Sequence, residues 1–105
     1  MISNTPKVPY YAVIFTSVKT EDTFGYDEMS FKMIELVKKQ EGFLGMESVR
    51  NDIGITISYW ESMEVIKKWK HNLEHIEARE KGRSLWYKKF KVRICKVEKD
   101  YGFKK

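Results

Sequence analysis

The stretch YYAVIFTSV, residues 10–18, constrains the fold more than any other part of the sequence. Its aromatic and β-branched residues predict a strand. Apolar side chains occupy both faces over most of its length, which is typical of a strand at the centre of a sheet. We therefore expect a sheet whose two faces are both covered by packed apolar groups.

Two amphipathic helices are predicted on either side of a hairpin. The first begins at Asp27, which can cap it, and Gly42 is placed to end it as a left-handed C′ residue. Its apolar residues recur at helical spacing, at Met29, Met33, Leu36 and Val37. Ser62 caps the second helix, whose apolar stripe consists of Val65, Ile66, Trp69, Leu73 and Ile76. Gly82 interrupts this second helix.

Three further segments are predicted as strands. Residues 43–51 and 55–60 form a hairpin around the tight turn DIG. In the second of these strands, one face carries Ile55, Ile57 and Tyr59 and the other carries Thr56, Ser58 and Trp60. A short helical turn carries Trp86 and Tyr87, and the stretch FKVRICKV forms the last strand.

The resulting order β-α-β-β-α-β predicts an α+β fold of the ferredoxin-like type, with one antiparallel sheet and both helices on one face. Residues 9–105 form this single domain, and residues 1–8 form a flexible N-terminal arm. The opposite face of the sheet is too apolar to meet water, and the chain has no third helix to cover it. A second copy packed face to face, in a homodimer, satisfies this requirement.

The amino-acid composition disfavours several classes of function for this chain. A hydrophobic content of 42% is that of a folded domain, and the 20 basic and 15 acidic residues, net charge +5, are interleaved as on a solvated surface. Nucleic-acid binding is therefore not favoured, and the strand 55–60 lacks the spaced aromatic residues that stack bases. The single Cys95, expected as a small buried residue, indicates a reducing cytoplasm. Neither a signal peptide nor a membrane span is visible.

The pentapeptide HNLEH, residues 71–75, matches the H-x-x-E-H motif of one class of zinc peptidases. A catalytic zinc site needs three protein ligands, and no third ligand can be named. On the helical wheel His71 lies on the solvent side and His75 at the flank of the apolar stripe, so His71 should be exposed and His75 half-buried. We predict no metal site here.

Five stretches follow one another in the sequence: YYAVIFTS, EGFLGMES, GITISYWES, IKKWKHNLEH and GRSLWYKKFKVRICKVEKDYGF, which together span residues 10–103. In this order they resemble small bacterial proteins of the antibiotic biosynthesis monooxygenase superfamily. The pattern consists of Tyr59-Trp60 at a strand end, Trp69 nine residues later, and then a helical histidine. The resemblance implies a dimeric α+β barrel.

The resemblance also implies an activity. Members of the superfamily oxygenate polycyclic phenols without metal or flavin, by binding and ionising the substrate so that it reduces oxygen itself. We therefore expect a cofactor-independent monooxygenase of an aromatic or quinone-like small molecule, and alternatively a non-catalytic ligand-binding dimer of the same fold. Haem degradation is disfavoured, because the first strand has no Asn and the position ten residues after Trp69 is Arg79, not His.

Eight residues are candidates for the site, in a cleft expected between the sheet and the second helix. Trp69 would wall this cleft, and His75 would serve as general base, since histidine changes charge near neutral pH. Substrate contacts are expected from Trp60, Asn72, Arg79, Arg83, Trp86 and Tyr87, of which the last two would close the cleft. Each has a structural alternative, because Trp69 can be a core residue and Arg83 can pair with a glutamate.

Overall fold

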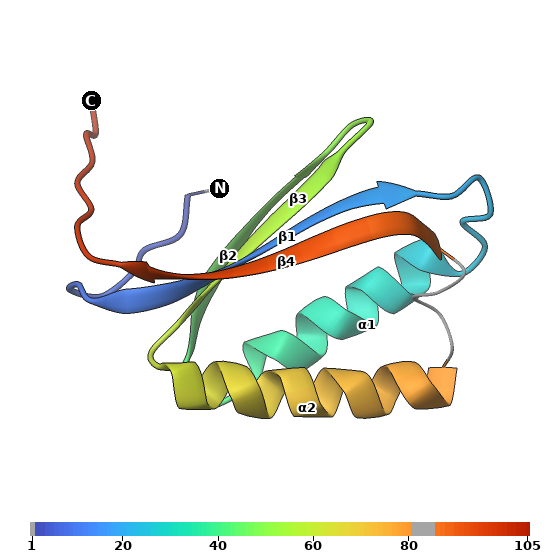
Figure 1. The fold of residues 1–105 in the computed structure, drawn as a ribbon. Coiled ribbons are helices and arrows are strands. Elements are labelled where there is room, and N and C mark those ends of the chain that lie inside the picture. Colours follow the sequence, from blue (N-terminus) through green and yellow to red (C-terminus); the bar gives the residue numbers. More distant parts are fainter. Residues whose placement is uncertain (1, 81–85) are drawn as a thin grey trace.

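The computed structural model describes the backbone of residues 2–80 and 86–105 and the side chains of residues 2–76 and 86–105. Its elements follow the predicted order: β1 (Tyr10–Lys19), α1 (Tyr26–Lys38), β2 (Phe43–Arg50), β3 (Gly54–Trp60), α2 (Met63–Glu80) and β4 (Tyr87–Val97). The four strands form one sheet in the order β2-β3-β1-β4, and every neighbouring pair is antiparallel. Both helices lie on one face of this sheet (Figure 1). The ferredoxin-like fold is confirmed.

Most element boundaries agree with the sequence-based expectations, and the exceptions have local causes. Ser62 caps α2 as expected, with its hydroxyl accepting a hydrogen bond from the N–H of Val65 at 3.3 Å. The N-cap of α1 is Gly25, at φ 79°, so Asp27 stands inside the first turn instead of capping it. Lys39 is the C-cap of α1, and Gly42, also at φ 79°, lies three residues further on. Tyr87 is the first residue of β4 and not part of a helical turn.

The register of the strands decides which side chains face the helices. Cross-strand partners in a sheet point to the same face. Tyr11 is opposite Trp60, and Trp60 is opposite Phe43, so these three aromatic residues share one face. They belong to the main core, together with Val13, Val37, Met46, Val65, Ile66 and Trp69. The core therefore lies between one half of the sheet and the two helices, and it includes the first half of the predicted α2 stripe.

The other face of the sheet carries no helix, and we call it the helix-free face. Its central apolar residues, by register, are Ala12, Ile14, Val18, Val49, Ile55 and Ile57. Val49 is 68% exposed and Ile55 is 37% exposed. Cys95, opposite Ala12 on this face, is exposed instead of buried as expected from its apolar run. No helix in the described part of the chain lies over this face, although Ala12 beside Cys95 is only 6% exposed.

Both termini are attached to the helix-free face near one end of the sheet (Figure 1). In the segment expected as a flexible arm, the Ser3 N–H donates to Glu47 Oε2 at 2.9 Å, and the Thr5 hydroxyl donates to the Tyr10 hydroxyl at 2.9 Å. The Tyr10 hydroxyl in turn donates to Asp100. Tyr10 is consequently only 4% exposed although it lies on the helix-free face.

Candidate functional site

A groove of about 430 Å³ runs between the two helices. The α1 side contributes Leu36 and Gln40, and α2 contributes Trp69, His71, Asn72, His75 and Ile76. The expected cleft lay between α2 and the sheet, whereas this groove lies between α2 and the end of α1. Residues 69, 72 and 76 repeat at intervals of three and four, so a single face of α2 supplies most of the lining.

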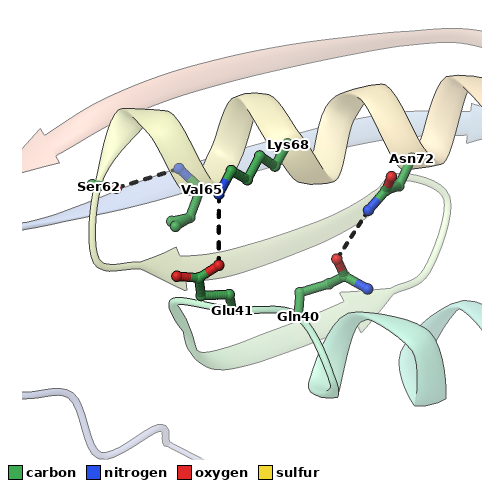
Figure 2. Close-up of polar contacts among 6 residues, drawn as sticks. All are labelled: Gln40, Glu41, Ser62, Val65, Lys68 and Asn72. Atoms are coloured by element: carbon green, nitrogen blue, oxygen red, sulfur yellow. Dashed lines mark hydrogen bonds and ion pairs between the residues drawn. The ribbon is translucent and has the colours of Figure 1, made fainter.

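Polar contacts join α2 to the segment that follows α1, beside this groove (Figure 2). Asn72 Nδ2 donates to Gln40 Oε1 at 3.1 Å, and the Gln40 amide nitrogen donates to the Leu36 carbonyl at 3.1 Å. Lys68 and Glu41 form an ion pair at 3.6 Å, with both side chains largely exposed, so it adds little stability. The Asn72–Gln40 bond gives the groove a fixed pair of amides beside the Trp69 ring.

One indole, that of Trp69, forms the inner wall of the groove, and a second indole packs behind it. Trp60 and Trp69 are stacked with ring centroids 6.3 Å apart and an interplanar angle of 24°. Trp60 is fully buried and its indole N–H donates to Ser58 Oγ at 2.9 Å, so Trp60 lies behind Trp69 and does not reach the lining. Within the described part of the chain, the Trp69 indole N–H has no hydrogen-bond partner. Trp69 is thus both a core-packing residue and the largest ring of the groove.

Both histidines of α2 line the groove from its outer rim. His71 is exposed as expected, but His75 is also exposed rather than half-buried. Among residues whose side chains are described, no three His, Cys, Asp or Glu side chains gather as metal ligands. An imidazole on this rim can accept a proton from a ligand that stacks on Trp69.

Trp86 and Tyr87 lie at another part of the molecule. The Trp86 indole N–H donates to the Phe24 carbonyl at 2.9 Å, and Tyr87 Oη donates to Tyr26 Oη at 3.4 Å. Both aromatic residues therefore pack at the start of α1, ten residues or about 15 Å along the helix from Leu36. The side chain of Arg79 and all of Arg83 lie outside the described residues. The structure thus gathers Trp69, Asn72 and His75 from the predicted set.

Gln40 and Leu36 complete the groove and were not predicted. Leu36 had been assigned to the apolar stripe of α1, and it remains 37% exposed. Gln40 lies just after the end of α1. An amide side chain is common at that position, so it indicates no function by itself. Only the packing of α1 against α2 brings these residues opposite Asn72.

A second group of polar side chains lies on the helix-free face. Tyr59 Oη donates to Glu47 Oε1 at 2.7 Å, and Ser3 binds the other carboxylate oxygen. Burial and the hydrogen bond to Glu47 raise the pKa of Tyr59 to about 12. The hydrogen bonds from Tyr59 and from the Ser3 N–H lower the pKa of the Glu47 carboxyl. These contacts explain how a carboxylate is tolerated on an otherwise apolar surface.

This pair gives a titration that can be measured. Folded Tyr59 keeps its proton to about pH 12, whereas an unfolded tyrosine loses it near pH ~10. The stabilisation from that proton is therefore complete below the unfolded pKa and is lost as the pH rises through the folded pKa. Tyrosinate absorbance should show a late-titrating group in the native protein that disappears in Tyr59→Phe. Tyr101→Phe, at a residue 93% exposed, is the control and should leave the late-titrating group in place.

Comparisons with known proteins identify the family. The sequence profile of the family described as monooxygenase af470-like matches residues 15–95. The chain belongs to the monooxygenase af470-like family. A relative of this family member, the uncharacterized protein YqjZ of Bacillus subtilis (strain 168), is 53% identical over 100 residues, covering 93% of this chain and 88% of the relative.

Solved structures agree with this monooxygenase af470-like assignment at the level of the fold. The cofactor-independent oxygenase SnoaB of Streptomyces nogalater superposes with a TM-score of 0.67 at 7% identity, covering 93% of this chain and 100% of SnoaB. A proposed antibiotic biosynthesis monooxygenase of Bacillus cereus has a TM-score of 0.62 at 19% identity, covering 91% and 100%. The resemblance to the antibiotic biosynthesis monooxygenase superfamily is therefore confirmed. None of the helices in the described part of this family member is long and apolar enough to span a membrane.

Proposed function

We propose that this protein is a monooxygenase that acts without metal or flavin on an electron-rich aromatic small molecule. The groove between α1 and α2 would hold this substrate, with its ring stacked on Trp69. The observation that carries the proposal is the grouping of an indole, a fixed amide pair and two imidazoles along one groove. The family and the likeness to an oxygenase fold support it.

The proposed reaction converts an activated CH₂ group of a phenolic substrate into a carbonyl. His75 accepts a proton from the substrate, and the resulting carbanion supplies the electrons that reduce dioxygen. One oxygen atom enters the new C=O bond, and the other leaves as water with the two hydrogens of the CH₂ group. Trp69 and the Asn72–Gln40 pair would orient the substrate so that its anion is held while oxygen reacts.

Oxygen uptake with an anthrone as substrate and no added cofactor tests this proposal. Trp69→Phe should lower kcat/KM about tenfold through lost stacking, and His75→Gln should lower kcat about a hundredfold through loss of the base. Lys70→Gln, on the same helix but outside the groove, should retain full activity. Unchanged turnover in His75→Gln would rule out its role as base, and no oxygen uptake would rule out the monooxygenase itself.

A second candidate function is ligand binding without turnover, in a dimer of the same fold. The exposure of His75 favours it, because a base open to water lacks the dry surroundings that strengthen catalytic proton transfer. In that case an aromatic ligand should quench Trp69 fluorescence and bind more weakly to Trp69→Phe, while no oxygen is consumed.

We further propose that two copies associate through their helix-free faces, so that the sheets form a barrel. No helix in the described part of the chain lies over the central apolar residues of this face, and Val49 and Ile55 are 68% and 37% exposed. On β4 this face continues into the basic residues Lys89, Lys91 and Arg93. A paired arrangement would bury the apolar centre and leave these cations at the rim, which is the usual anatomy of an interface.

A further inference from the structure

The helix-facing side of the sheet is not apolar throughout. By register, one row across it consists of Arg50, Gly54, Ser17 and Phe90, and the next consists of Ser48, Thr56, Phe15 and Val92. Ser48 and Thr56 share a hydrogen bond of 2.9 Å through their hydroxyl groups. A surface turned toward two helices is expected to be apolar. These two rows therefore need an explanation other than core packing.

Arg50 is held in place against this surface. Its guanidinium donates a hydrogen bond to the hydroxyl of Ser17, which is only 1% exposed. It also lies directly over Gly54, where a Cβ atom would overlap it. Glycine at this position allows the guanidinium to rest on the backbone of β3, so the orientation of Arg50 is built into the sheet.

Lys19 brings a second positive charge close to Arg50, beside the ring of Tyr26. Lys19 Nζ lies 3.5 Å from the centroid of the Tyr26 ring, and the Arg50 guanidinium carbon lies 6.0 Å from the same centroid. Within the part of the chain whose side chains are described, neither cation pairs with a carboxylate. Two partly buried like charges without a counter-ion are unfavourable. A bound anion would remove this cost.

Apolar surface lies next to these cations. Phe90, Val92 and Ile94 of β4 face the helix side by register, yet they are 46%, 42% and 43% exposed. A ligand with an aromatic body could cover them while its charged end meets Arg50. Arginine suits this role, since its planar fork binds a carboxylate through two parallel hydrogen bonds.

We propose that Arg50, with Lys19 and the Tyr26 ring, binds the carboxylate of an aromatic acid whose ring packs against Phe90 and Val92. This site lies at the start of α1, apart from the groove at the end of α1. The proposal does not depend on the monooxygenase activity, because it rests on Arg50, Lys19 and the exposed residues of β4.

Isothermal titration of the full chain with 2-naphthoate tests the proposal, with neutral 2-naphthol and inorganic phosphate as comparison probes. Arg50→Gln should weaken 2-naphthoate binding at least about tenfold, since it removes a charge-assisted hydrogen-bond pair. Gly54→Ala keeps the charge but displaces the guanidinium, and it should weaken binding by a similar factor. Arg93→Gln, an arginine on the opposite face of the sheet, is the matched control and should bind as the wild type does.

Several results would overturn the proposal. Equal affinity of wild type and Arg50→Gln for 2-naphthoate would do so, as would an equal loss in Arg93→Gln, which would mark non-specific charge attraction. Phosphate binding as tightly as 2-naphthoate would refute the role of the aromatic ring. Neutral 2-naphthol binding as tightly as 2-naphthoate would refute the role of the carboxylate. If Arg50→Gln does not fold, as seen by circular dichroism, Lys19→Gln provides the second variant, and unchanged affinity there would refute the paired-cation site.

Discussion

Replacing Ile55 with aspartate is expected to convert the proposed dimer into monomers while the sheet stays folded. Ile55 lies between Val49 and Thr16 on the helix-free face and is 37% exposed in the single chain. In the proposed dimer both copies would bury the new carboxylate without a partner, at ~2 kcal/mol or more for each copy. The dissociation constant should therefore rise about a thousandfold. Light scattering coupled to gel filtration measures the change.

Cys95 provides an independent readout of the same interface. It is the single cysteine of the chain, and it is exposed on the helix-free face of one copy. A thiol reagent should modify it slowly in the dimer and quickly in Ile55→Asp. Ile53→Asp is the control, because Ile53 is 52% exposed and lies in the turn between β2 and β3. A monomeric wild type, or an Ile55→Asp variant that remains dimeric, would disprove this interface.

Gly42→Ala is expected to lower the free energy of unfolding by ~2–4 kcal/mol. Gly42 has φ 79°, a conformation that costs a residue with a Cβ about 1 kcal/mol or more. A Cβ at this position would also lie 2.6 Å from a methyl group of Val65, which is 9% exposed in the core. Overpacking of this kind typically costs ~1–3 kcal/mol. Urea denaturation of both proteins measures the difference.

A double-mutant cycle separates the two causes of this loss. In a Val65→Ala background the overlaps with both methyl groups disappear, and only the contact with the Cβ of residue 65, at 2.9 Å, remains beside the backbone strain. Gly42→Ala should then cost about 1–2 kcal/mol. Gly102→Ala is the control, because nothing lies within 4 Å of the added Cβ. An equal cost in both backgrounds would show that Val65 does not resist the substitution.

The local patterns of the sequence predicted the elements well. The alternation of Ile55, Ile57 and Tyr59 with their polar neighbours placed β3 correctly, and the spacing of Val65 and Ile66 identified the buried side of α2. These predictions succeed because hydrophobic periodicity arises from residues a few positions apart. The same patterns placed Cys95 in an apolar run but could not show that Cys95 is exposed on the face that carries neither α1 nor α2.

The site depended on contacts between distant segments. Trp69 was expected to wall the cleft and Trp60 to contact the substrate, yet the packing buries Trp60 behind Trp69. Gln40 became part of the groove only through its hydrogen bond to Asn72, 32 residues away. The sequence did hold one unused signal. In β2, Glu47 and Val49 point to one face of the sheet and Arg50 points to the other. This alternation predicts that the Arg50 guanidinium faces the helices.

The order of the strands and helices, the apolar stripe of α2 and the Ser62 cap follow from the sequence by itself, because each depends on neighbouring residues and on backbone geometry. The positions of the groove and of Arg50 were decided only in the tertiary structure. Antiparallel pairing sets Arg50 opposite Gly54 and next to Ser17, and the packing of α1 on α2 sets Gln40 opposite Asn72. Register and helix packing are chosen by the total burial of apolar surface, which no short stretch of sequence contains.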